Sequence, residues 1–330
     1  MQAITVPSPG GADALVYTHL PDVAPGHGEV LIEVAAAGVN RADISQREGL
    51  YPPPSGASPL PGMEVSGIIR SLGRGVRDWA VGDRVCALLP GGGYASLAVA
   101  RAGQLLPVPD FLDLVEAAGL PEAIATVWSN VFLTAGLRAG ETLLVHGGSS
   151  GIGTIAIQLA RAFGCLVAVT AGSPAKLSAC EQLGAEILID YRQSDFAKEL
   201  SAATDDRGVD VILDSIGGAY LDRNLRSLAP RGRLVNIANL SGETGTLDFG
   251  LVMRRWLSIH GSTLRARPAA EKDEIIASVR ENVWPLVMTG QVVPVIDSRF
   301  ALADAGRAHQ RLESSEHIGK LLLLPEVNPV

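Results

Sequence analysis

A glycine-rich turn in the middle of the chain constrains the fold more than any other feature. Residues 145–164 read VHGGSSGIGTIAIQLARAFG. After the turn, apolar residues follow the i, i+3, i+4 rhythm of an amphipathic helix, namely Ile152, Ile155, Ala156, Leu159, Ala160 and Phe163. Such a turn suits a phosphate because missing β-carbons allow close approach and the amides at the helix start favour an anion. The glycine spacing departs from GxGxxG, so the alternative is a tight turn without a ligand.

The sequence shows two different secondary-structure patterns, one before this turn and one from the turn onward. From about residue 142, apolar strand runs such as TLLVHGG, CLVAVTAG, EILIDY and VDVILDSIGG alternate with helical patterns. This alternation predicts βαβ units on a Rossmann-type, doubly wound parallel sheet. Before residue 121, short strands broken by glycine and proline predict a β-rich domain. The last stretch, with a helix and the strand HIGKLLLL, lies outside the alternation and is expected to return to the first domain. The predicted fold class is therefore α/β.

Composition excludes several classes of protein. A length of 330 residues favours two domains, and a net charge of -8 gives no overall attraction to nucleic acid or to anionic membranes. No apolar run approaches the roughly 20 residues of a membrane span, and the first residues lack the pattern of a targeting signal. The three cysteines, Cys86, Cys165 and Cys180, form no CxxC pair, which favours a reducing compartment. We therefore expect a cytoplasmic protein with no nucleic acid partner and no membrane partner.

The residues after the second predicted strand of the alternation indicate which dinucleotide would bind. An NAD site usually has an acidic residue there, but the sequence reads TAGSPAK. Ser173 offers a hydroxyl, Lys176 a positive charge, and Tyr191 and Arg192 follow the next strand. These groups favour the 2'-phosphate of NADPH over the bare ribose of NADH. The alternative is that both cations are ordinary surface charges.

The sequence motif GGSSGIG also occurs in short-chain dehydrogenases, but the rest of the chain does not fit that family. Those enzymes begin near the glycine turn and carry a YxxxK pair, whereas here 144 residues precede the turn and no tyrosine has a lysine four residues on. The motifs AAAGVNRADISQREGLYPPP, LPGMEVSGIIRSLGRGV, VGDRVCALLPGGGYA, LPEAIATVW and HIGKLLLL, in this order, resemble instead the medium-chain dehydrogenase/reductase superfamily. They are most similar to its zeta-crystallin-like quinone oxidoreductases, in the branch of the p53-inducible quinone oxidoreductase.

This resemblance implies a domain organisation and a set of site residues. It implies a GroES-like barrel as catalytic domain (1–121), a Rossmann NADPH-binding domain (122–264) and a return segment completing the catalytic domain (265–330). It places Asn40 and Tyr51 beside the substrate pocket, with no certain catalytic residue. The residues that it assigns to the cofactor are Tyr51, Thr126, Ser150, Gly151, Ile152, Gly172, Ser173, Lys176, Tyr191, Ser215, Ile216, Asn239, Leu264 and Lys320.

Four of these residues have a structural alternative. Tyr51 could pack against the prolines that follow it, and Asn40 could cap a turn or helix. Thr126 could bond its own helix backbone, and Lys320 could flank a strand to deter edge pairing. His146, at the end of a buried strand, is expected to be hydrogen-bonded and structural. Cys86 is expected to be a small buried strand residue.

Metal ligands decide between the zinc-dependent and the zinc-free members of the superfamily. Where the zinc-dependent alcohol dehydrogenases carry a cysteine and a GHE triplet, this sequence has Asn40 and Met63. Asp43 and Glu64 remain as possible ligands, but two carboxylates without a soft partner are more simply structural groups. We therefore predict a reductase without metal or flavin.

Three functions remain open from the sequence. The first is an NADPH-dependent quinone reductase, whose transfer from nicotinamide C4 is by hydride or by single electrons. The second is a reductase of activated double bonds in enones or alkenals. The third is an NADPH-binding structural or RNA-binding protein of the crystallin type, for which the basic residues of 253–268 are the candidate surface, although these also suit a subunit interface. The resemblance further implies a homodimer or homotetramer.

Overall fold

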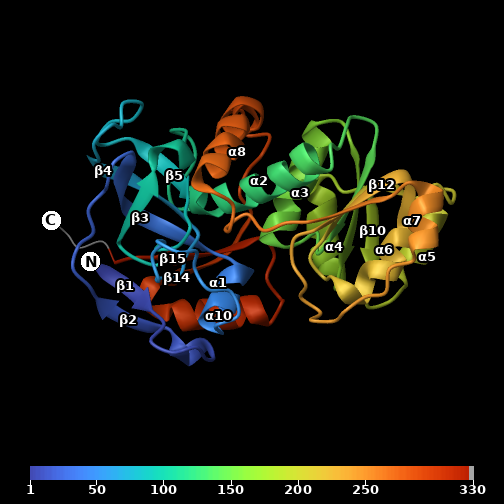
Figure 1. Ribbon diagram of the computed structural model, residues 1–330, viewed down its shortest axis with the longest axis horizontal. Helices are drawn as coiled ribbons and strands as arrows, with labels where there is room; N and C mark the ends of the chain where they lie inside the picture. Colours follow the sequence, from blue (N-terminus) through green and yellow to red (C-terminus); the bar gives the residue numbers. More distant parts are fainter. Residues whose placement is uncertain (327–330) are drawn as a thin grey trace. The chain divides into compact units, whose positions relative to one another are not determined.

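The chain divides into two compact units in the computed structural model, which describes residues 1–326 (Figure 1). The first unit contains the residues up to Ala123, together with Arg265–Met288 and the residues from Val293 on. The second unit contains Ile124–Leu264 and Thr289–Val292. The assignment of catalytic and cofactor-binding roles to 1–121, 122–264 and 265–330 stays a prediction, and residues 327–330 of the last range lie outside the described residues.

A six-stranded sheet forms the centre of the second unit. Its strands are β8 (Thr142–His146), β9 (Leu166–Ala171), β10 (Ile187–Asp190), β11 (Val209–Asp214), β12 (Leu228–Asn236) and β13 (Ser258–Gly261). All neighbours pair in parallel, in the order β10-β9-β8-β11-β12-β13. The chain order reverses between β8 and β11, so the sheet is doubly wound, as predicted, and the carboxyl ends of all six strands lie at one edge.

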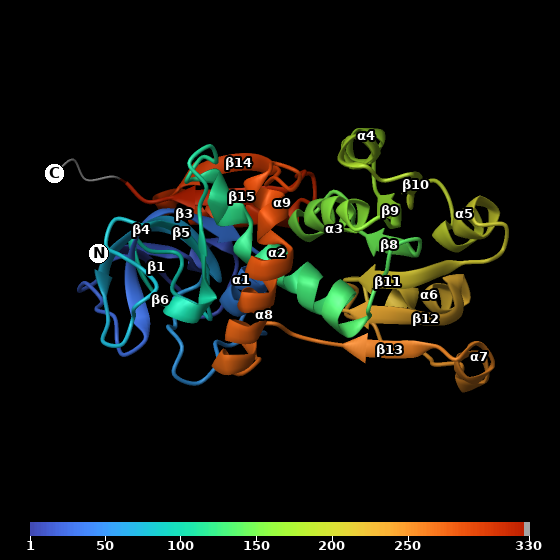
Figure 2. The same cartoon turned by 90° about the horizontal axis from the view of Figure 1, so that it is seen from above.

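Helices connect these strands and cover the sheet. They are α3 (Gly151–Ala162), α4 (Pro174–Leu183), α5 (Phe196–Ala203), α6 (Leu221–Ser227) and α7 (Phe249–Arg255), with the short turn Gly218–Tyr220 before α6. Helix α3 contacts α4, whereas α6 contacts both α5 and α7. Figure 2 shows α3 and α5 on opposite faces of the sheet. Because both faces are covered, the central strands β8 and β11 are buried throughout and apolar in their middle residues.

The second unit begins inside a helical segment. Helix α2 (Pro121–Val127) continues into a π-helical stretch, Trp128–Thr134. The rings of Trp128 and Phe132 stack at 4.9 Å, and both contact Phe163 just after α3. This aromatic cluster fixes the segment against the first helix of the Rossmann unit.

A mainly antiparallel sheet forms the first unit. Its seven strands are β3 (Glu29–Val39), β4 (Glu64–Leu72), β5 (Arg84–Leu88), β6 (Leu97–Arg101), β7 (Leu105–Pro107), β14 (Ile296–Ala301) and β15 (Lys320–Leu324). The order is β14-β15-β3-β4-β5-β7, with β6 also paired to β3. The strands β1 (Gln2–Thr5) and β2 (Val16–His19) form a separate pair. The closing segment of the chain therefore contributes two strands to the sheet that the first hundred residues begin.

Helices of the first unit are few. They are α1 (Arg41–Arg47), α8 (Ala269–Asn282), α9 (Trp284–Met288) and α10 (Ala305–Glu313), with short 3-10 turns at Ala12–Ala14, Ala102–Gln104, Glu116–Gly119 and Leu302–Asp304. Across residues 1–326, no helix has both the length and the apolar character that crossing a membrane requires.

One edge of this sheet gathers polar residues. Strand β3 runs antiparallel to both β15 and β4, so its last residue, Val39, lies beside the first residues of its two neighbours. Asn40, which follows β3, is thereby brought to the same edge as Lys320 and Glu64, although the three are far apart in the sequence.

Candidate functional site

The glycine turn lies at the carboxyl edge of the six-stranded sheet. Ser150 precedes α3, and its Oγ accepts a hydrogen bond from the Gly153 amide at 3.0 Å. The amides of Gly151 and Ile152 begin the helix, where no preceding turn offers a carbonyl acceptor. A β-carbon on Gly153 would lie 2.5 Å from the carbonyl oxygen of Gly148, so only glycine permits this turn. The turn therefore fits an anionic group such as a pyrophosphate.

A second group of predicted residues lies where β9 and β10 end. Gly172 and Ser173 follow β9, and Ser173 caps α4 by accepting a hydrogen bond from the Lys176 amide at 3.4 Å. Tyr191 follows β10, and its hydroxyl would be 2.6 Å from a β-carbon on Gly172. Arg192 lies beside the same glycine, and both Tyr191 and Arg192 are exposed. Hydroxyls and basic groups thus gather where an adenosine ribose would lie in this fold, and no acidic residue occupies 171–176.

A third group comes from the loops after β11 and β12. The amide of Leu240 donates to the carbonyl of Ser215 at 3.0 Å, and the amide of Ser241 donates to that of Ile216 at 3.0 Å. Asn239, in the second loop, accepts a hydrogen bond from the Gly218 amide at 3.2 Å. The two loops therefore support each other at the same carboxyl edge.

Buried polar groups support these loops from below. His146 ends β8, and its two ring nitrogens lie 3.1 Å from Thr170 Oγ1 and 2.7 Å from Asn224 Oδ1. Burial lowers the pKa of His146 to about 4, so the ring is neutral at pH 7. Asn224 Nδ2 donates to Asp214, whose carboxylate also accepts hydrogen bonds from the amides of Ile216 and Gly217. Burial raises the pKa of Asp214 to about 6, although these hydrogen bonds oppose the shift. His146 is thus hydrogen-bonded and buried, as predicted.

Two further predicted cofactor residues belong to the second unit. Thr126 lies in α2 with 6% exposure, and its carbonyl accepts a hydrogen bond from Asn130 Nδ2 at 2.8 Å. Leu264 is the last residue of the long second-unit segment and is 8% exposed. Their contact with a cofactor stays a prediction.

Asn40 and Lys320 meet in the first unit. Lys320 Nζ donates a hydrogen bond to Asn40 Oδ1 at 2.6 Å and forms an ion pair with Glu64 Oε1 at 2.5 Å. Asn40 occupies the N-cap position of α1, as the structural alternative proposed, but its side-chain amide donates to Glu64 at 2.9 Å. Asp43 completes the group by accepting hydrogen bonds from the amides of Asn40 and Gly62 and from the hydroxyl of Tyr94. Burial raises the pKa of Asp43 to about 6, against the effect of these hydrogen bonds.

Arg265 is a residue of this region that sequence reasoning missed. Its guanidinium carbon lies 5.5 Å from the centre of the Tyr51 ring, and Nη1 donates to the Tyr51 carbonyl at 3.4 Å. Nε donates to Pro90 O and Nη2 to Gln46 Oε1, both at 2.7 Å. The sequence placed Arg265 in the basic stretch 253–268, but it is only 5% exposed, so it does not add to a basic surface. No local pattern marks it, because its partners lie 175 to 219 residues away.

Neither the cysteines nor a metal cluster adds to the site. Cys86, Cys165 and Cys180 are free and buried, and Cys86 lies in β5 as predicted. Among residues 1–326, no group of three or more histidine, cysteine, aspartate or glutamate side chains could hold a metal ion. The side chain of Asn40 instead bonds an ammonium and a carboxylate.

Family models match both parts of the chain. Residues 26–110 match the alcohol dehydrogenase GroES-like domain, and residues 151–280 match the zinc-binding dehydrogenase domain. The chain is 35% identical to the quinone oxidoreductase of Pseudomonas aeruginosa over 96% of its own length and 97% of the relative. It is also 32% identical to the phthioceranic/hydroxyphthioceranic acid synthase of Mycobacterium tuberculosis, but it spans only 15% of that protein's length.

Solved structures agree with these matches. The quinone oxidoreductase of Escherichia coli complexed with NADPH superposes with a TM-score of 0.88, at 28% identity, over 98% of this chain and 100% of that one. The CurF ER cyclopropanase from the curacin A biosynthetic pathway superposes with a TM-score of 0.86, at 27% identity, over 98% of this chain and 99% of that one. With a GroES-like unit and a Rossmann unit in one chain and full-length relatives above 30% identity, the chain belongs to the medium-chain dehydrogenase/reductase family, among the relatives of the quinone oxidoreductases.

Proposed function

We propose that the protein is an NADPH-dependent reductase of quinones that works without metal or flavin. The observation that carries the proposal is the polar group at the carboxyl ends of β9 and β10, where Tyr191 and Arg192 lie beside Gly172. Ser173 caps α4, Lys176 lies in the first turn of this helix, and no acidic residue occupies 171–176. Positive charge and hydroxyl donors there would stabilise a 2'-phosphate, whereas an NAD site usually has a carboxylate for the ribose diol. Full-length similarity to a quinone oxidoreductase supports the substrate class.

The residues of the second unit would hold the cofactor by its phosphates. The amides of Gly151 and Ile152 would donate to the pyrophosphate. Further contacts would come from the loops after β11 and β12, through Ser215, Ile216 and Asn239. Thr126, Leu264 and, from the first unit, Tyr51 are further proposed contacts. The resemblance implies the same role for Lys320, whose ammonium is bonded to Asn40 and Glu64. When bound, NADPH supplies the reducing equivalents at nicotinamide C4. The protein's task is then to orient a flat, electron-poor acceptor and to exclude water from it.

Asn40 and Tyr51 are the proposed substrate residues of the first unit. Both are fixed by buried polar partners, Asn40 by Lys320 and Glu64, and Tyr51 by the buried Arg265. Such support gives the precise placement that orientation of a substrate requires.

Reduction of an activated carbon-carbon double bond is the second candidate function. It is favoured by the similarity to the Mycobacterium tuberculosis synthase and to the CurF ER cyclopropanase. Turnover assays separate the two: purified protein is mixed with NADPH and either a soluble benzoquinone, a naphthoquinone, an enone or an alkenal, and absorbance is followed at the nicotinamide band. We expect turnover with the quinones. Turnover with enones or alkenals alone would replace the first candidate by the second.

RNA binding by the basic stretch 253–268 is the weakest alternative. Arg265 is buried, and Arg255 Nη1 donates to the carbonyls of Arg226 and Leu228 at 2.9 and 2.8 Å. Two of the cations are therefore already engaged within the protein. A titration with RNA at low salt would detect any remaining binding, and its absence would remove this alternative.

We also propose a cytoplasmic homodimer or homotetramer. Strand β13 is an edge strand of the six-stranded sheet, and Ile259 in this strand is 40% exposed. Met253 and Trp256, just before it, are 70% and 65% exposed. An apolar edge of this kind is a frequent site of association. Light scattering at micromolar concentration tests the proposal, since the mass of one chain, 34.4 kDa, would contradict it.

A further inference from the structure

Three neighbouring strands of the first unit place an ammonium, a carboxylate and a carboxamide in contact. Strands β15, β3 and β4 are neighbours in the sheet (Figure 1). Lys320 begins β15, Asn40 follows β3 and Glu64 begins β4. Lys320 is 4% exposed, Glu64 0% and Asn40 8%. The second oxygen of Glu64 accepts a hydrogen bond from the Glu122 amide at 2.8 Å. Each oxygen of the buried carboxylate therefore has at least one donor.

Glycines make room for the two charged side chains. Gly38 lies in β3, the strand between β15 and β4. A β-carbon on Gly38 would lie 2.6 Å from the carboxyl carbon of Glu64. A β-carbon on Gly119 would lie 3.3 Å from Cγ of Lys320, a distance at which the lysine would have to move. The local sequence thus accommodates the ion pair on both sides.

Stability alone is a poor explanation for this pair. Removing an ammonium and a carboxylate from water carries a large desolvation penalty, and a well-packed apolar pair is often as stable. A buried ion pair is therefore weak evidence of added stability, and what it positions has to be considered. The two charges also make hydrogen bonds to one and the same carboxamide, that of Asn40.

The charges fix the orientation of that carboxamide. Its oxygen faces the ammonium of Lys320 and its nitrogen faces the carboxylate of Glu64. A flipped carboxamide would place two donors against each other at Lys320 and two acceptors against each other at Glu64. The nitrogen carries two N–H bonds, of which one donates to Glu64. The other N–H is consequently held in one direction. An ammonium on the amide oxygen also withdraws electrons, which strengthens that remaining donor.

From this geometry we infer that Lys320, with Glu64, is a positioning residue that makes Asn40 a fixed and polarised hydrogen-bond donor to the oxygen of the acceptor molecule. The inference rests on the proposed function, in which Asn40 borders the substrate. As a quinone or enone accepts electrons, its carbonyl oxygen gains negative charge, and a donor already in place stabilises that charge. No covalent step involves these three side chains.

The inference differs from the role that the sequence resemblance implies for Lys320. A direct contact between this lysine and NADPH would affect cofactor affinity, whereas positioning of Asn40 affects turnover of the acceptor. The two roles therefore predict different kinetic changes on removal of the lysine.

The double variant Lys320→Met/Glu64→Gln tests the inference, because it removes both charges and leaves neither buried alone. We expect kcat with the quinone to fall at least tenfold, while the NADPH dissociation constant, measured by fluorescence titration, stays within twofold. The matched control is Arg299→Met/Glu116→Gln, which removes an exposed ion pair of the same unit and should leave both quantities unchanged. Unchanged kcat in the test variant, or a loss of activity fully explained by weaker NADPH binding, would overturn the inference.

A measurement on the wild-type protein covers the case in which the double variant does not fold. In protein labelled with ¹⁵N at asparagine, the Asn40 side-chain amide should exchange with water at least 100-fold more slowly than that of the exposed Asn282. Exchange at the same rate as Asn282 would overturn the inference. If wild-type protein reduces neither quinones nor enones, the proposed function fails, while the exchange measurement still reports whether the three side chains are held together.

Discussion

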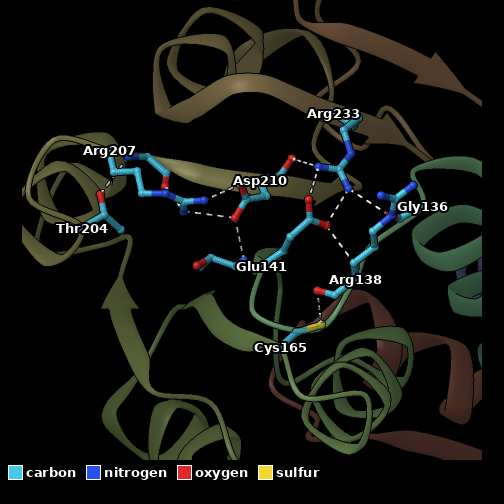
Figure 3. A network of polar contacts seen from close by, with 10 residues as sticks. Gly136, Arg138, Glu141, Cys165, Thr204, Arg207, Asp210 and Arg233 are labelled. Carbon is cyan, nitrogen blue, oxygen red and sulfur yellow. Dashed lines mark hydrogen bonds and ion pairs between the residues drawn. The ribbon is translucent and has the colours of Figure 1, made fainter.

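The two edges of the six-stranded sheet use polar residues in opposite ways. At the amino edge, Arg233 binds both oxygens of Glu141 at 2.7 and 2.9 Å and also donates to the carbonyls of Ala135 and Gly136 (Figure 3). Arg207 forms a second ion pair with Asp210 at 2.7 Å. Charged groups of this edge are therefore engaged with one another and with the backbone.

The carboxyl edge is arranged differently. Ser150 and Ser173 each accept a hydrogen bond from an amide of the helix that they precede, and Tyr191 and Arg192 remain exposed beside Gly172. Its buried support, His146 and Asn224, lies beneath the loops. One sheet thus separates two tasks: ion pairs hold the amino edge together, whereas polar side chains such as Tyr191 and Arg192 stay exposed at the carboxyl edge. Substitutions at the two edges should therefore affect different measurements.

The largest effect is expected at the glycine turn. In Gly153→Ala, the new β-carbon would collide with the backbone carbonyl of Gly148, so the turn must open and its amides lose their alignment. We expect NADPH affinity, measured by fluorescence titration, to fall about 100- to 1,000-fold, which is about 3 to 4 kcal/mol. The control is Gly261→Ala in β13, where a β-carbon meets nothing within 4 Å. An affinity loss below fivefold in a folded Gly153→Ala protein would show that the turn does not bind the phosphates.

At the amino edge, the change should appear in stability instead. Arg233→Met would leave the partly buried Glu141 without its two strongest donors. We expect the free energy of unfolding, from urea titration, to fall by about 2 to 3 kcal/mol. NADPH affinity of the folded protein should not change. The exposed pair of Arg226 with Asp222 provides the control, since Arg226→Ala should cost less than about 0.5 kcal/mol. A large loss of NADPH affinity in Arg233→Met would contradict the separation of the two edges.

The fold was predictable from sequence because its signals are local. Alternation of buried strands with helical patterns is repeated along the second unit, and the glycine turn fixes where the first strand ends. The roles of the buried charges were not predictable in this way. Lys320 reaches Asn40 across 280 positions, and the bond exists only because β15 pairs with β3.

The burial of Arg265 also could not be predicted from the sequence. In the sequence it is one of several arginines near an apolar strand, and nothing in the sequence distinguishes it from them. Its burial depends on Gln46 of helix α1 and on Tyr51 and Pro90, which lie in loops of the first unit. Composition and spacing carry no information on such contacts, since they arise only when distant segments pack.

A smaller effect is expected for the choice between NADPH and NADH. Lys176→Ala removes a positive charge from the first turn of α4, next to the proposed 2'-phosphate position. We expect NADPH affinity to fall about 30-fold, about 2 kcal/mol, and NADH affinity to change less than twofold. Lys198→Ala, on the exposed side of α5, is the control. Equal losses for both cofactors would exclude a 2'-phosphate contact at this lysine.

The smallest expected effect is a difference between the two edges in how their contribution to stability depends on pH. Burial lowers the pKa of His146 to about 4, whereas in the unfolded chain a histidine titrates near 6.5. Between these values the unfolded chain binds more protons, so the contribution of a neutral His146 to stability is complete above pH 6.5 and declines as the pH falls toward 4. At pH 5.5 this decline amounts to about 1.4 kcal/mol. Asp214 has its pKa raised to about 6 and works in the opposite direction, so the pH profile of the wild type alone does not isolate the histidine.

The comparison of wild type with His146→Gln isolates it, because Asp214 is present in both proteins. The destabilisation caused by His146→Gln should shrink by about 1.4 kcal/mol between pH 7.5 and pH 5.5, as measured by urea unfolding at each pH. The destabilisation caused by Arg233→Met should be the same at both values. Although burial works in the opposite direction, hydrogen bonds from Arg233 hold the pKa of Glu141 below its usual range, and this pair stays charged throughout. If the two variants showed the same pH dependence, the neutral histidine beneath the carboxyl edge would not be what distinguishes it from the amino edge.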